Sequence, residues 1–160
     1  GRPGVNIIFG ITDLSKNNFN VSEVDNRTIF QEDFQEVLEN YYDIYAISLD
    51  IPISEFNYEN NILNWDAARF TTIMSNYDAL QVAPNGPTTY YDATNNLVFT
   101  GRYLSDDVMG FTLTLMFGGA DGTRFDGNNG TPQLTTDAVG PGDRDFTLPF
   151  PYLEVPLTQE

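Results

Sequence analysis

The sequence predicts an α+β domain in which about three helices pack on short, mainly antiparallel strands. Apolar residues recur at helical spacing in two stretches, and they alternate with polar residues in others. The final third is rich in glycine, aspartate and asparagine, which is typical of loops. A chain of 160 residues has the size of one domain, and 41% hydrophobic residues suffice for a packed core, so residues 1–160 are expected to form a single domain.

The first half of the chain predicts one strand and one helix. The run "VNIIF" at 5–9, bounded by glycines, indicates a buried strand, and the polar stretch "TDLSKNNFN" that follows indicates a loop. A helix is expected over about 29–41, because Thr28 and Gln31 have the spacing of a capping box. Its predicted core stripe consists of Phe30, Phe34, Val37, Leu38 and Tyr41.

The middle of the chain predicts a strand at 44–51, where Tyr45, Ile47, Leu49 and Ile51 alternate with other residues. A second helix is expected over about 65–75, with Asn64 as its cap. Another strand is expected at 79–83, and a hairpin in the stretch "TTYYDATNNLVFT".

The stretch "GRYLSDDVMGFTLTLMFGG" at 101–119 fits both a helix and a strand. Glycine and threonine disfavour a helix, but Ser105 can cap one, and two acidic residues suit its positive end. We therefore expect a helix over 105–117, with Asp106 and Asp107 in a structural role. The functional alternative is a carboxylate pair acting as acid and base, although adjacent residues of a helix point about 100° apart.

The loop-rich final third holds the candidate metal ligands. Aspartates in "DGTRFDGNNG" and "TTDAVGPGDRD" could bind calcium, although the spacing is not that of an EF-hand and no terminal glutamate follows. The candidate ligands are Asp121, Asp126, Asp137, Asp143 and Asp145. Local turns made by aspartate side chains explain the same residues without any ligand, so no cofactor is required.

The composition excludes several classes of function. A net charge of −16 repels nucleic acid and favours cations, neutral sugars or a basic partner protein. With neither cysteine nor histidine, the chain cannot carry thiol catalysis, a histidine base or the usual zinc sites. It also has no apolar run of about 20 residues, so no membrane-spanning segment is expected.

Seven motifs, taken together and in order, resemble one family. They are "GRPGVN" at 1–6, "FN" at 19–20, "YDALQV" at 77–82, "GRYLSDDV" at 101–108, "MFGG" at 116–119, "LTTDAVGPGDRDF" at 134–146 and "FPYL" at 150–153. The chain resembles the C-terminal part of the domain of unknown function 4331 family, in a form similar to members from Bacteroidota. The resemblance implies an envelope or secreted protein, located in the periplasm, at the cell surface or outside the cell. It implies no catalytic residue, and "DAVGPGDRDF" lacks the glycine and asparagine usual in the family, which weakens the calcium hypothesis.

These observations favour a non-enzymatic subunit or interaction module. The alternatives are a carbohydrate- or calcium-binding module and a carboxylate-based glycan hydrolase. The start at "GRPG" indicates the C-terminal portion of a longer protein. We expect an apolar patch near it, covered by a missing N-terminal part or by a partner protein. The apolar side chains of Phe150, Tyr152 and Leu153 are expected to pack on the domain.

Overall fold

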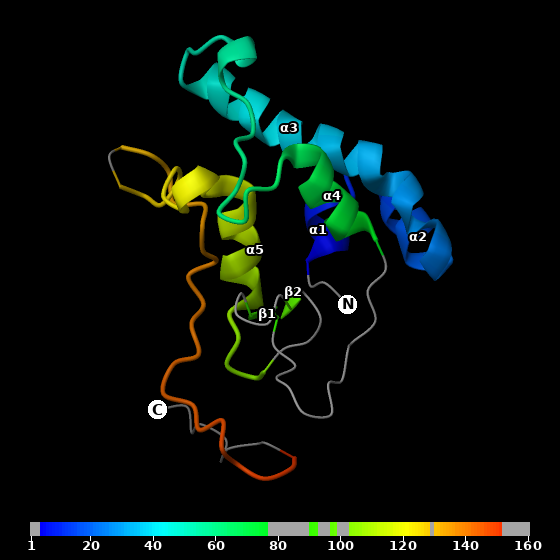
Figure 1. Cartoon of the computed structure of the whole chain (residues 1–160), viewed down its shortest axis with the longest axis vertical. Coiled ribbons are helices and arrows are strands. Elements are labelled where there is room, and N and C mark those ends of the chain that lie inside the picture. The colour runs from blue at the N-terminus through cyan, green and yellow to red at the C-terminus, as the bar shows by residue number, and fades with distance from the viewer. Residues whose placement is uncertain (1–3, 77–89, 93–96, 99–102, 129, 152–160) are drawn as a thin grey trace.

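The computed structural model describes residues 4–76, 90–92, 97–98, 103–128 and 130–151, and they are mostly helical (Figure 1). The α-helices are α1 (Val5–Phe9), α2 (Asp13–Val21), α3 (Gln31–Ser48), α4 (Ala67–Ser75) and α5 (Val108–Phe117). Short 3₁₀ helices are η1 (Val24–Phe30), η2 (Ile53–Glu55) and η3 (Gly119–Asp121). The two strands are β1 (Tyr91–Asp92) and β2 (Leu97–Val98).

The predicted α+β class is therefore wrong. The strands β1 and β2 form one antiparallel pair, with Tyr91 opposite Val98, in the region where a hairpin was expected. Within the described residues, no larger sheet exists on which helices could pack. The expected turn of the hairpin and the strand expected at 79–83 lie outside the described residues.

Helix α3 is the longest element, and the others assemble around it (Figure 1). Helices α1 and α4 pack against α3, and phenylalanine rings fill the space between them. The rings of Phe9 and Phe34 stack with their centroids 4.9 Å apart. Phe70 of α4 packs edge-on against Phe9. Aromatic packing thus joins three helices that lie far apart in the sequence.

The stretches predicted as strands at 5–9 and 44–51 are wholly and largely helical, respectively. Residues 5–9 form α1, because Val5 and Phe9, four residues apart, are the buried side chains. Residues 44–48 continue α3, in which Tyr42 and Ala46 face the core at the same spacing. Ile7 and Ile47, which contributed to the predicted strands, are exposed. Their exposure shows that the buried residues alone have helical periodicity.

The caps also differ from the prediction. The expected loop at 12–20 contains most of α2, whose N-terminus is a capping box made by Thr12 and Ser15. The expected cap Thr28 lies inside η1, and α3 starts at Gln31 with no side-chain cap. The Gln31 side chain instead donates a hydrogen bond to Thr71 Oγ1 of α4, at 3.0 Å. It joins the two helices there.

The other two predicted helices are confirmed. Helix α4 matches the helix expected over 65–75, and Asp66 rather than Asn64 caps it by accepting a hydrogen bond from Arg69 N. Helix α5 matches the one expected over 105–117. Its threonines are accommodated because Thr112 and Thr114 donate hydrogen bonds to carbonyls one turn earlier in the same helix.

Candidate functional site

The paired aspartates before α5 have separate structural roles. Asp107, not Ser105, caps the helix, and its Oδ1 accepts a hydrogen bond from Gly110 N at 2.8 Å. Asp106 Oδ2 accepts hydrogen bonds from the backbone nitrogens of Tyr90 and Tyr103. Asp106 thus holds the segment before β1 against the turn before α5. This geometry supports the structural reading of the pair.

A small cleft brings the paired aspartates before α5 close to Asp137, one of the candidate calcium ligands. Its volume is about 240 Å³, and it lies between the start of α5 and the loop at 137–146. Asp106, Asp107, Asp137, Arg144 and Phe146 are among the side chains that line it. Both walls come from motifs of the family resemblance, which the sequence separates by about 30 residues. The carbohydrate-binding alternative, which stays a prediction, can be tested at this cleft.

The candidate calcium ligands lie in local turns. Asp121 accepts hydrogen bonds from the backbone and hydroxyl of Thr123, and Asp145 does the same with Thr147. Asp126 binds Asn128 in a similar way. These hydrogen bonds lower the pKa of all three carboxyl groups.

Asp137 and Asp143 are the other two candidate calcium ligands. Asp137 accepts a hydrogen bond from Val139 N. Asp143 is exposed in the same loop. Within the described part of the chain, no three acidic side chains come close enough to hold one metal ion. The structure therefore does not bring the five aspartates together.

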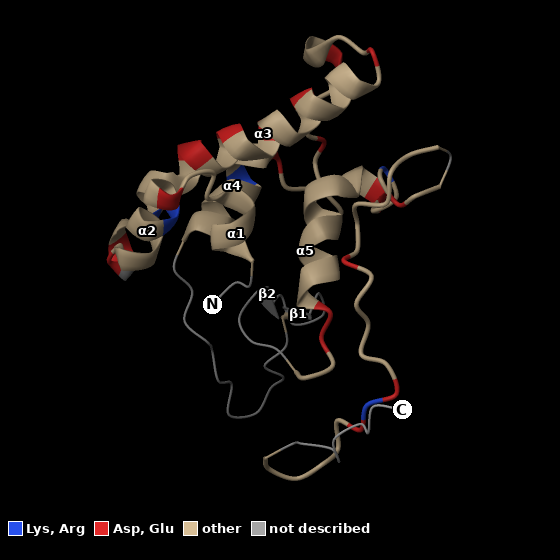
Figure 2. Ribbon diagram, turned by 180° about the vertical axis from the view of Figure 1, so that it is seen from behind, with Lys and Arg blue, Asp and Glu red and all other residues tan. Residues whose placement is uncertain are grey.

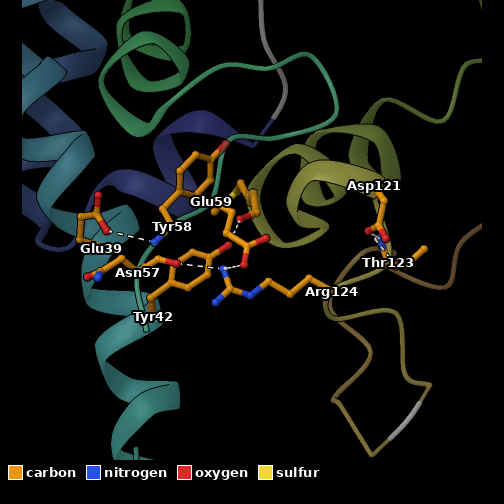
Figure 3. Close-up of polar contacts among 9 residues, drawn as sticks. Glu39, Tyr42, Asn57, Tyr58, Glu59, Asp121, Thr123 and Arg124 are labelled. Carbon is orange, nitrogen blue, oxygen red and sulfur yellow. Dashed lines mark hydrogen bonds and ion pairs between the residues drawn. The ribbon is translucent and has the colours of Figure 1, made fainter. Parts of the chain in front are cut away.

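Two tyrosines from outside α5 cap its C-terminal end; both are labelled in Figure 3. Tyr42 of α3 donates a hydrogen bond to the carbonyl of Met116 at 2.5 Å. Tyr58 donates one to the carbonyl of Leu115 at 2.8 Å. These carbonyls belong to the last turn of α5, where no backbone donor within the helix is available. Burial raises the pKa of both phenols well above its usual value, so they remain donors.

Arg124 completes this polar cluster (Figure 3). Its guanidinium lies 3.4 Å from the Glu59 carboxylate and donates a hydrogen bond to the carbonyl of Asn57. It also lies over the rings of Tyr42 and Phe56. Because these contacts join α3, the loop after η2 and the loop after η3, they are a structural clamp.

Glu39 lies beside this clamp on α3. Its Oε2 accepts a long hydrogen bond, 3.5 Å, from Tyr58 N. Burial raises the pKa of Glu39, and the nearby charge of Asp43 acts in the same direction. The surroundings of the Glu39 carboxylate therefore disfavour its charged form.

A larger groove lies between α1 and α3, on the side of α3 away from the clamp residues. Its volume is about 670 Å³. Its walls are mainly apolar and are formed by α1, the link after it, the start of α2 and the second half of α3. The apolar side chains include Ile7, Ile11, Ile44 and Ile47. Lys16 and Asp43 are its charged residues.

The isoleucines of this groove are unusually exposed. Ile7 and Ile11 are 82% and 68% exposed, and Ile44 and Ile47 are 62% and 71% exposed. Single exposed apolar residues are normal on proteins, but several around one hollow are typical of an interaction site. An apolar patch near the N-terminus was expected, and one is present. Its residues lie on and beside helices, and not on the predicted strand.

Sequence reasoning missed the most connected side chains of the structure. Tyr58 lies in a stretch for which no element was predicted, and Arg124 lies in the loop-rich final third. Their contacts reach 57 and 67 residues along the chain. Nothing in the local sequence marks such partners. The groove did have a signal, because Ile44 and Ile47 are apolar at positions where an α3 with one buried face would be polar.

Comparisons with family models, with curated proteins and with solved structures find no match to the chain. The resemblance to the domain of unknown function 4331 family therefore stays a prediction. Among the described residues, the helices are all too short or too polar to cross a bilayer.

Proposed function

We propose that the protein is a non-enzymatic interaction module and that the groove between α1 and α3 is its docking surface. The observation that carries the proposal is the set of four exposed isoleucines around one hollow of about 670 Å³. A cavity of this size admits several apolar side chains of a partner. Covering each isoleucine would contribute about 1.5–3 kcal/mol before the unfavourable terms of association.

Contacts behind the groove hold its walls in place. Tyr41, which lines the groove, donates a hydrogen bond to the carbonyl of Ile8 at 2.9 Å. Val5 and Phe9 anchor α1 in the core on its other side. The walls of the groove are thus fixed before any partner arrives, which reduces the entropy lost on binding.

The roles of Asp106 and Asp107, the pair considered as a catalytic acid and base, support the non-enzymatic part of the proposal. Asp106 and Asp107 are occupied by backbone hydrogen bonds that build the start of α5. The expected location in the periplasm, at the cell surface or outside the cell stays a prediction of the resemblance.

Photo-crosslinking tests the proposal, and the absence of cysteine from the chain makes the labelling site unique. A photo-reactive maleimide would be attached to Ile44→Cys or Ile7→Cys, and the labelled chain returned to its source cells or their extract. Both positions should capture the same protein. The control Ile29→Cys lies at an exposed residue outside the groove.

Affinity purification with Ile44→Ser/Ile47→Ser adds the second arm. The double variant should lose the captured protein, whereas Ile29→Ser should retain it. Capture that is equal at all three labelled positions, or that the double variant leaves intact, would place the partner elsewhere and refute the groove as the docking surface.

A further inference from the structure

Resting on the proposed function, we infer that the occupant of the groove is an amphipathic α-helix of a partner protein, with lysine or arginine residues beside its apolar stripe. The inference joins two observations. One is the spacing of the exposed isoleucines, and the other is the charge of the surface around them.

The spacing favours a helix as the occupant. Ile44 and Ile47 lie one turn apart on α3, and Ile7 and Ile11 lie four residues apart on the other wall. A helix presents apolar side chains every three or four residues and can fill such a double row. An extended peptide that binds by adding a strand would need a free strand edge, and the described walls of the groove are helices and a connecting turn.

The charge favours a basic helix. Asp43 lines the groove, and the exposed residues Glu32, Asp33 and Glu36 continue the acidic surface along α3 (Figure 2). The whole chain carries −16. Charges of this kind attract cationic side chains over about 8 Å at physiological salt.

Lys16 sets the orientation of this contact. It is the positive side chain that lines the described groove, and it comes from α2. The basic residues of the partner should therefore lie toward α3.

A second copy of the chain is the competing occupant. Pairing two copies through this face would bring together two acidic α3 surfaces on molecules that each carry −16. Repulsion of like charges opposes that arrangement, whereas a basic helix gains attraction from the same surface. The observations thus favour a partner of opposite charge.

Three labelled peptides of about 18 residues test the inference by fluorescence anisotropy against the full chain, because that length gives about five helical turns. The first contains leucine and lysine in an amphipathic helical pattern, the second has glutamate in place of lysine, and the third is a scrambled form of the first. The first should bind, and the other two should bind at least about tenfold more weakly.

Variants of the protein separate the groove from general attraction by charge. Ile44→Ser/Ile47→Ser should weaken binding of the lysine peptide at least about tenfold, because it removes apolar contact and leaves the charge unchanged. Asp43→Asn should weaken it by about threefold and reduce its dependence on salt. Ile29→Ser should have no effect. All these residues are at least partly exposed, and an unchanged melting temperature would confirm that each variant folds.

Each contrary result has a distinct meaning. Equal binding of the scrambled peptide, insensitive to the serine variant, would reduce the interaction to charge alone and overturn the inference. Equal binding of the lysine and glutamate peptides, with loss in the serine variant, would overturn the basic helix but leave the docking groove standing. No peptide binding, together with a dimer that the serine variant dissociates, would identify a second copy as the occupant. A monomer that binds none of the peptides would also overturn the inference.

Discussion

Replacing Tyr42 with phenylalanine should destabilise the protein without creating a cavity. The Tyr42 side chain is 1% exposed, and its hydroxyl donates to the Met116 carbonyl at 2.5 Å. Removing the hydroxyl leaves that buried carbonyl with one fewer donor. The expected loss in the free energy of unfolding is about 1–3 kcal/mol.

Urea unfolding followed by the fluorescence of Trp65, the single tryptophan, measures this loss. For a chain of this size, a loss of about 2 kcal/mol corresponds to a fall of about 4–8 °C in melting temperature. Tyr45→Phe is the matched control, because Tyr45 stacks on Phe125 at 5.3 Å but its hydroxyl has no partner among the described residues. Equal stability of the two variants would refute the role of Tyr42 as a cap of α5.

Other substitutions test the roles assigned near α5 and α3. Gly110→Ala should destabilise α5, although alanine is the better helix former by about 1 kcal/mol, because its Cβ would meet the capping carboxylate of Asp107; a more stable variant in thermal unfolding would contradict this. Asp106→Ala should lower the free energy of unfolding by about 1–3 kcal/mol, since two backbone nitrogens lose their acceptor; no change would remove its structural role. Glu39→Gln should stabilise the protein at pH 7 more than Glu36→Gln does, and the difference should vanish below the ordinary pKa of 4.5, because burial raises the pKa of Glu39 and its ionised form opposes folding. A difference that persists at pH 3 would point to packing instead. Millimolar calcium should leave the melting temperature unchanged, and a rise of several degrees that magnesium does not reproduce would revive the calcium hypothesis.

The predictions from sequence succeeded where one face of a helix is buried and the other is polar. Helix α4 fits that pattern, with Phe70 and Met74 buried. The predictions failed in α1 and in the second half of α3, where apolar residues occupy both faces. In α3 and the residues after it, the exposed Ile47 and Leu49 supplied half of the alternation that predicted a strand at 44–51. The residues that face the core there are Tyr42 and Ala46, at helical spacing.

The same failure occurred in α1 and had the same cause. Val5 and Phe9 make the buried face, and Ile7 between them is exposed. The two misread segments are thus the two principal walls of the groove. Apolar residues that folding does not require disturbed the periodicity, and those residues are the ones we assign to docking.

The remaining parts of the site depend on contacts that no local pattern encodes. The cap of α5 comes from Tyr42 and Tyr58, 74 and 57 residues away in the chain. The packing expected for Phe150 at the end of the chain was also mispredicted. Phe150 is 82% exposed, whereas Tyr152 and Leu153 lie outside the described residues.

The most direct test of the docking groove is the methyl spectrum of the protein with ¹³C-labelled isoleucine, recorded while the leucine–lysine peptide is added. The methyl signals of Ile7, Ile11, Ile44 and Ile47 should shift together and saturate at one concentration of peptide. The signals of Ile29, Ile53 and Ile62, which are exposed outside the groove, should stay in place. Shifts confined to those three isoleucines, or spread equally over all seven, would contradict a docking surface between α1 and α3.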